Sequence, residues 1–198
     1  MSSVLLSTAY LPNLKYLSQL VNSDDVVLEY HEYYVKQSQR NRCDILSSTG
    51  TLRLSIPLVQ QADKEIISQK RISYAEKWQH QHWRTITTAY KNSAYFEFFE
   101  HEFKPFYETE YEFLFEYNLE IIKTVLNILR VKKEIKLTSQ FELNPINTVD
   151  FRKINYNELD LDFNEKPYYQ VFADKLGFTA NLSCLDALFN VGLETKNL

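Results

Sequence analysis

The chain has 198 residues, a formal net charge of −4 and an isoelectric point of about 5.6, a length that suits one domain of ordinary size. Glycine occurs three times, each time alone, so the sequence contains neither a P-loop nor a dinucleotide-binding glycine loop. The acidic balance argues against a DNA or RNA partner. Nucleotide phosphates, if the protein binds them, must therefore be held by side chains or helix ends.

The N-terminal residues 1–12 hold no basic segment, and their apolar run is too short for a signal peptide or a membrane span. We therefore expect a cytoplasmic protein without a transmembrane segment, in which Cys43 and Cys184 are reduced thiols. Two cysteines so far apart do not make a zinc cluster by themselves. The sequence predicts no metal site, and it identifies neither a cofactor nor an oligomeric state.

The first part of the chain predicts mostly strands. Residues 4–6 and 25–30 are apolar runs typical of buried strands, and leucines at helical spacing between them, after Pro12, predict a helix. Residues 44–58 alternate apolar and polar side chains around a Thr-Gly turn, which is the pattern of a β-hairpin. Residues 66–74 suggest one more strand.

The second part of the chain is mainly helical in pattern. Apolar residues recur at helical spacing over residues 78–90 and 110–130, and a shorter helix is expected over residues 93–101. Residues 139–165 are polar and predict a long loop. Residues 183–192 begin with a serine cap and end on a glycine, which predicts a helix capped at both ends.

These elements predict an α+β fold. We expect a single domain, residues 1–198, in which a small mixed sheet from the first 75 residues is packed by a mainly helical second half. The many glutamates of residues 97–120 are interpreted as the solvated face of these helices.

A basic cluster stands between the second predicted strand and the hairpin. Lys36, Arg40, Asn41 and Arg42 bring an ammonium, two guanidinium groups and an amide into seven residues. Because the planar fork of arginine matches the oxygens of a phosphate or carboxylate, the cluster predicts an anion site. Salt bridges to acidic residues of the helices are the alternative, and the residue types alone leave both open.

His82 shares the apolar stripe of a predicted helix with Trp78. It is interpreted either as a core histidine hydrogen-bonded in place or as a general base that faces a pocket. His80 lies about 200° away on a helix, so the two imidazoles do not chelate a metal ion. Cys43 is a candidate nucleophile, since the neighbouring guanidinium of Arg42 would lower the thiol pKa, although strand alternation points the two side chains apart.

Four stretches together resemble one known family. They are residues 8–20 (TAYLPNLKYLSQL), 36–58 (KQSQRNRCDILSSTGTLRLSIPL), 77–96 (KWQHQHWRTITTAYKNSAYF) and 168–192 (YYQVFADKLGFTANLSCLDALFNVG). In this order and at this spacing the chain resembles the WbqC-like protein family, bacterial proteins associated with gene clusters for O-antigen and other surface polysaccharides. The resemblance covers nearly the whole chain, and residues 139–165 are its least distinct part.

Carried over position by position, the resemblance marks Tyr10, Pro12, Tyr16, Lys36, Arg40, Asn41, Arg42, Trp78, His82, Tyr90, Tyr95, Phe96, Tyr169, Gln170, Asn181, Ser183, Asp186 and Asn190. From the residue types and the resemblance together, the expected ligand-binding residues are Tyr10, Lys36, Arg40, Arg42, Tyr90 and Gln170, and the expected catalytic residues are His82 and Asn41. Residues 7–9 read Ser-Thr-Ala where many members carry His or Thr and Gln, so a role of that polar pair does not carry over.

Two functions are expected. In the first, the protein is an enzyme that transfers an acyl or aminoacyl group to an amino sugar or a sugar nucleotide. The arginines then hold a phosphate or carboxylate, Asn41 orients the substrate, and His82 removes a proton from the attacking amine. In the second, the protein is a non-catalytic accessory factor of polysaccharide assembly, with an aromatic surface that stacks on sugars. In both, the ligand is a small molecule or a sugar.

Overall fold

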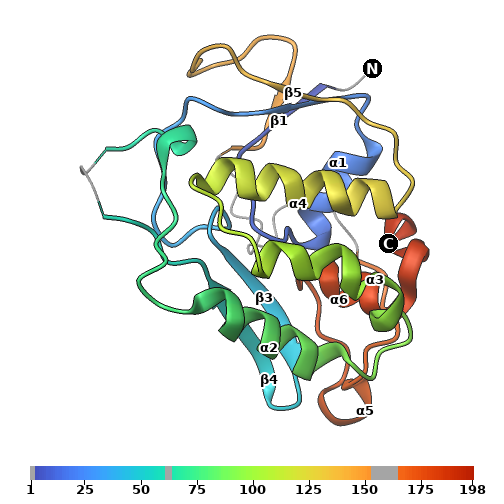
Figure 1. Ribbon diagram of the computed structural model, residues 1–198. Helices are drawn as coiled ribbons and strands as arrows, with labels where there is room; N and C mark the ends of the chain where they lie inside the picture. Colours follow the sequence, from blue (N-terminus) through green and yellow to red (C-terminus); the bar gives the residue numbers. More distant parts are fainter. Residues whose placement is uncertain (1–2, 61–63, 153–164) are drawn as a thin grey trace.

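The fold is built around a parallel sheet (Figure 1). The computed structural model describes residues 3–60, 64–152 and 165–198. In the order β5-β2-β1-β6, the sheet consists of β1 (Ser3–Leu6), β2 (Asp25–Leu28), β5 (Ile135–Leu137) and β6 (Val149–Asp150). Every neighbouring pair runs parallel, so all four carboxyl ends lie along the same edge.

Helix α1 (Leu14–Asn22) connects β1 to β2 and completes a βαβ unit. Asn13 caps the helix, because its side-chain oxygen accepts a hydrogen bond from the Tyr16 backbone N–H at 3.0 Å. Pro12 directly precedes this cap, so the helix begins after Pro12, as the sequence predicts. If the four strands are numbered by their order in the chain, their order across the sheet is 3-2-1-4. The first four strands of a dinucleotide-binding sheet have the same order.

The predicted hairpin is confirmed and forms a second, antiparallel sheet. Strands β3 (Arg42–Ser47) and β4 (Gly50–Ser55) pair along their full length. Successive side chains of β3 alternate between the two faces. Cys43 is buried against the core, whereas Arg42 and Asp44 lie partly exposed on the other face.

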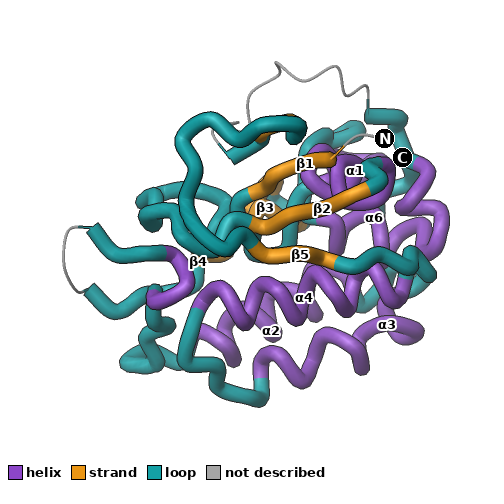
Figure 2. Tube along the Cα trace, turned by 90° about the horizontal axis from the view of Figure 1, so that it is seen from above, coloured by secondary structure: helices purple, strands orange, loops and turns teal. Residues whose placement is uncertain are grey.

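The remaining helices are α2 (Trp78–Tyr90), α3 (Phe96–Phe103), α4 (Leu114–Ile128), the short α5 (Ala173–Leu176) and α6 (Cys184–Val191), with 3₁₀ turns at Ile67–Gln69, Lys104–Tyr107 and Gly192–Asn197. Helix α4 lies between the parallel sheet and the layer formed by α2 and α3 (Figure 2). Helix α6 contacts α2, α3 and β3. The helices thus join the parallel sheet and the hairpin into one packed body.

Phe189 of α6 ties the C-terminal segment to the core. Its ring is fully buried and packs against Tyr90, Phe96 and Phe103, with ring centroids 5.1 to 5.7 Å apart. Burial of a side chain of this size stabilises a fold by about 1.5–3 kcal/mol. The last helix is therefore an integral part of the core.

The α+β class is confirmed, but two predictions about strands are wrong. The parallel sheet is not confined to the first 75 residues, because β5 and β6 come from residues 135–150. These strands have three and two residues, too few to leave an alternating pattern. Residues 66–74 form no continuous strand, because a 3₁₀ turn at Ile67–Gln69 separates isolated β-bridges at Ile66, Arg71 and Ile72. After this turn Lys70 points inward and binds the Glu65 carboxylate and the Val59 carbonyl.

The predicted cap of the last helix is confirmed in part. The Ser183 hydroxyl accepts a hydrogen bond from the Leu185 backbone N–H, but the Asp186 carboxylate turns to other partners. Of the predicted loop 139–165, residues 153–164 lie outside the described ranges. No helix in the described part of the chain has the length and apolar character needed to cross a membrane.

Candidate functional site

A cleft opens where the loop between β1 and α1 meets the hairpin and the chain that leads into α6. The residues that line it are Tyr10, Leu11, Pro12 and Asn13, then Gln37, Ser38, Gln39, Arg42, Cys43, Asp44 and Arg53, and finally Asn181 and Ser183. The empty space between its walls, including the part that is open to solvent, has a volume of about 390 Å³. The cleft is assembled from segments at both ends of the chain.

The β1–α1 loop occupies the place at which doubly wound sheets bind phosphates. It leads from the carboxyl end of β1 at Leu6 to the cap of α1 at Asn13. In sheets with this strand order, a phosphate lies between this loop and the N-terminus of the following helix. The loop has no glycine, but Leu11 adopts a φ of +42°, the left-handed conformation that glycine provides in phosphate-binding loops. The positive end of the α1 dipole therefore lies at the cleft.

The backbone around the cleft is strained. Among the described residues, five other than glycine have a positive φ, and three of these, Leu11, Gln37 and Asn181, line the cleft. Such conformations cost about 1–3 kcal/mol each and persist only where neighbouring contacts hold them. Here the Asn13 side-chain amide donates to the Asn181 side-chain oxygen at 2.6 Å, and the Tyr10 backbone N–H donates to the Gln39 carbonyl at 2.9 Å. Strain concentrated at one cleft is typical of a functional site.

Arg42 is the charged group of the cleft that has no carboxylate partner. Its Nε atom is buried without a hydrogen-bond acceptor, and no described acidic residue forms an ion pair with its guanidinium. The nearby Asp44 accepts two hydrogen bonds from Arg53, at 2.8 and 2.7 Å. The described residues that line the cleft include two arginines and one aspartate, a net charge of +1. Its electrostatics favour an anion.

The other members of the basic cluster lie elsewhere. Arg40 is buried and binds both carboxylate oxygens of Glu32, at 2.9 and 2.6 Å, and its guanidinium also donates to the Ser7 hydroxyl. The Asn41 amide donates to a backbone carbonyl and its oxygen accepts from a tyrosine hydroxyl, so both ends serve the fold. Lys36 is exposed beside the cleft residue Gln37. Arg42 is thus the member of the cluster that the structure places on the cleft.

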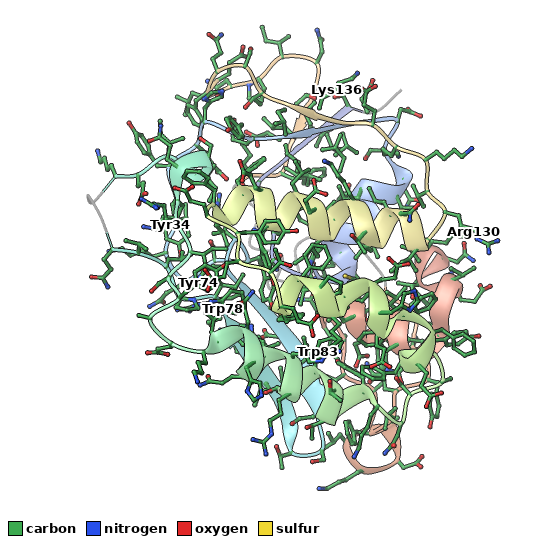
Figure 3. The ribbon with its side chains drawn as sticks, viewed as in Figure 1. Tyr34, Tyr74, Trp78, Trp83, Arg130 and Lys136 are labelled. Atoms are coloured by element: carbon green, nitrogen blue, oxygen red, sulfur yellow. The ribbon has the colours of Figure 1, made fainter. Side chains whose placement is uncertain are left out.

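His82 lies behind the cleft and does not line it. It is buried next to Trp78, which Figure 3 shows at the start of α2. One ring nitrogen, Nδ1, lies 3.1 Å from the Tyr10 hydroxyl, and the imidazole also hydrogen-bonds to the Ser55 backbone carbonyl. Burial lowers the pKa of His82 to about 4, and the bond to Ser55 opposes this shift. The ring is therefore neutral at pH 7 and has the contacts of a core histidine.

Tyr10 connects His82 to the cleft. It lines the cleft, yet its side chain is fully buried and its hydroxyl also hydrogen-bonds to that of Tyr107 at 2.9 Å. Burial raises the pKa of the Tyr10 phenol well above its usual value. The hydroxyl is therefore protonated at neutral pH and is committed to partners inside the protein.

Tyr90 and Gln170 meet at a buried carboxylate rather than at the cleft. Gln170 and Tyr168 donate to the same oxygen of Asp186, at 2.9 and 2.7 Å. Tyr90 accepts from the Leu46 backbone N–H at 3.2 Å, and its hydroxyl helps to lower the pKa of Asp186. Burial raises the pKa of the Asp186 carboxyl, and these hydrogen bonds oppose the shift. The network holds α6 against α2 and the hairpin.

The thiol of Cys43 is not activated. Although Cys43 lines the cleft, burial raises its pKa well above the usual value, which corrects the expectation that Arg42 would lower it. Among the described residues, no group of three or more His, Cys, Asp or Glu side chains is placed to hold a metal ion. His80 is exposed whereas His82 is buried, as the helical pattern predicts.

Several cleft residues could not be selected from the sequence as site residues. Asn13 carries a signal, since it precedes an apolar helical pattern and has the side chain of a cap. Gln37, Ser38 and Arg53 carry none, because surface polar residues occur throughout the chain. They lie at the cleft because Gln37 has a left-handed φ and because Arg53 pairs with Asp44 across the hairpin.

A model of the WbqC-like protein family matches residues 8–156, well over half of the chain. The chain belongs to the WbqC-like protein family. The matched range includes the β1–α1 loop, the basic cluster and the hairpin, whereas the wall of the cleft formed by Asn181 and Ser183 lies beyond it. No curated protein and no solved structure shows significant similarity to this WbqC-like chain.

Proposed function

We propose that this WbqC-like protein binds a phosphorylated or carboxylated small molecule of surface-polysaccharide assembly, with Arg42 holding the anionic group. The observation that carries the proposal is a guanidinium that pairs with no described carboxylate, at a cleft to which the β1–α1 loop contributes. The biological context comes from the surface-polysaccharide gene clusters with which the family is associated.

Three independent features support an anionic ligand. The cleft has a net positive charge, the N-terminus of α1 adds the positive end of its dipole, and the strand order places this loop where related architectures bind phosphates. Arg40 is excluded from this role because its guanidinium already forms an ion pair with Glu32. The proposal therefore distinguishes two arginines that stand two positions apart.

Calorimetric titration with inorganic phosphate and pyrophosphate tests the proposal. A guanidinium–phosphate contact contributes about 1.5–3 kcal/mol, so Arg42→Ala should weaken binding about 10- to 100-fold while the melting temperature changes little. Arg40→Ala is the matched control: it leaves Glu32 buried and unpaired, and should lower the free energy of unfolding by about 3–5 kcal/mol. Equal binding by wild type and Arg42→Ala would refute the proposal.

A second candidate function is acyl or aminoacyl transfer to an amino sugar, with His82 as the base. Its support is the hydrogen bond between His82 and Tyr10, a residue that lines the cleft. In this reaction the amine attacks a thioester, the thiolate leaves, and the amine proton passes toward the neutral imidazole. The position of His82 behind the cleft makes simple binding the better supported function.

Thiol release from acetyl-coenzyme A in the presence of glucosamine 6-phosphate separates the two functions. An enzyme should release thiol, and His82→Gln should lower the rate about 10²–10⁴-fold without loss of phosphate binding. No release by the wild type, together with phosphate binding that depends on Arg42, would favour the binding function.

A further inference from the structure

We infer that the cleft selects a single charged sugar ring, with Arg42 on its anionic group and the Asp44–Arg53 pair on its hydroxyls, and that it rejects nucleotides and acyl chains. This inference rests on the proposed binding function and specifies its ligand. It follows from the chemistry of the cleft wall.

The described side chains that line the cleft are mostly polar, and its apolar members are too few to form a wall for an acyl chain. Most of its lining residues carry amide, hydroxyl or charged side chains, and the members without a strong hydrogen-bonding side chain are Leu11, Pro12 and Cys43. A site for an acyl chain needs a continuous apolar wall. A polyhydroxylated ligand, in contrast, replaces the water of such a polar wall with hydrogen bonds of its own.

Among the described residues that line the cleft, none presents an exposed ring on which a nucleobase could stack. Tyr10 is the aromatic residue among the lining residues, and its side chain is fully buried, with its hydroxyl bound to His82 and Tyr107. Base recognition commonly uses an exposed aromatic face. The described part of the cleft therefore binds the phosphate of a nucleotide no better than phosphate alone.

Asp44 and Arg42 are placed for the two ends of one sugar ring. They are two positions apart on β3 and point to the same face, which separates them by about 6.6 Å along the strand. The Asp44 side chain is 19% exposed, and each of its oxygens accepts one hydrogen bond from Arg53. A carboxylate has about four acceptor sites, so Asp44 retains capacity for sugar hydroxyls while Arg53 fixes its orientation.

Calorimetric titration of the full chain with five probes tests the inference. Glucose 1-phosphate should bind at least about 10-fold more tightly than inorganic phosphate, a gain of about 1.4 kcal/mol. Uridine monophosphate and octanoate should bind no more tightly than phosphate. Glucuronate, the fifth probe, shows whether the anionic group can be a carboxylate: binding comparable to glucose 1-phosphate extends the ligand class to uronates, and no binding restricts it to sugar phosphates.

Two variants test whether the Asp44 side chain contacts the sugar. Asp44→Asn should bring the affinity for glucose 1-phosphate down to that for inorganic phosphate, without weakening phosphate binding itself. Glu112→Gln is the matched control, because Glu112 forms an exposed ion pair with Arg71 and does not line the cleft, and it should leave both affinities unchanged.

The outcomes separate this inference from the function on which it rests. If phosphate binds through Arg42 but glucose 1-phosphate binds no more tightly, or uridine monophosphate binds best, the inference is wrong and the proposed function stands. If no anionic probe binds, both are wrong. The comparison of probes uses the wild-type chain alone, so it remains decisive even if Asp44→Asn fails to fold.

Discussion

Arg40 and Arg42 show how two like residues of one cluster acquire different roles. Arg40 stands two residues before the hairpin, and its guanidinium turns toward Glu32 and Ser7, which follow strands of the parallel sheet. Arg42, the first residue of β3, lies partly exposed on the other face of the hairpin from Cys43 and pairs with no carboxylate in the described ranges. A buried arginine without a partner would be costly, so the bidentate bond to Glu32 is a condition for burying Arg40.

His82 makes the fold sensitive to acid. Its pKa is about 4 in the folded protein, against an ordinary value of 6.5. Below pH 6.5 the unfolded chain takes up a proton that the folded protein does not, so the free energy of unfolding should fall between pH 6.5 and about 4, by about 3 kcal/mol at most. Above pH 6.5 the residue should have no effect.

Urea unfolding of wild type and His82→Gln at pH 7 and pH 4.5 measures this contribution. The variant should lose less stability than the wild type between the two pH values. Asp186 and Glu165 have raised pKa values and act in the opposite direction, but they are present in both proteins and cancel in the comparison. Identical losses would show that the imidazole of the folded protein is not shielded from protonation.

At the scale of elements, α6 depends on the turn that follows it. Gly192 has a φ of +62°, and a Cβ placed there would lie 2.8 Å from the ring of Tyr95, just before α3. The Tyr95 backbone N–H also donates to the Phe189 carbonyl at 2.9 Å. The close approach of this loop to the end of α6 is therefore possible because residue 192 has no side chain.

Gly192→Ala should destabilise the protein more than Gly177→Ala. Both glycines have a left-handed φ, whose cost for alanine is about 1–3 kcal/mol, but no atom lies within 4 Å of a Cβ at Gly177. The difference in free energy of unfolding between the variants, measured in urea, therefore reports the contact with Tyr95. It should shrink in the background of Tyr95→Ala; a difference that persists there would assign the cost to the backbone alone.

At the scale of the whole molecule, we propose that residues 1–198 fold as one cooperative unit. The C-terminal segment supports this, because Leu185, Leu188 and Phe189 are fully buried. It also completes the cleft, since the Ser183 backbone N–H donates to the Asp44 carbonyl and the Cys184 backbone N–H to the Pro12 carbonyl, both at 2.7 Å. The matched family range and the segment that follows it thus share one core and one cleft.

A chain that ends at Glu165 should be insoluble or lack a cooperative thermal transition. Each large apolar side chain lost with α6 removes about 1.5–3 kcal/mol, and the total stability of a domain is about 5–15 kcal/mol. Solubility, near-ultraviolet circular dichroism and thermal melting measure the outcome. A soluble truncated chain with a sharp transition would place a domain boundary before residue 166.

The sequence by itself determined the α+β class, the hairpin, helix α2 and the family. Periodicity and turn residues are read from neighbouring residues, and family patterns are read from motifs in a fixed order along the chain. The sequence also predicted either an anion site or salt bridges for the basic cluster, and the anion site stays a prediction. Only the tertiary structure decided that β5 and β6 complete a parallel sheet, that Glu32 occupies Arg40, and that His82 lies behind the cleft. These features depend on which distant groups come into contact, and a strand of three residues or a single ion pair leaves no repeating pattern along the chain.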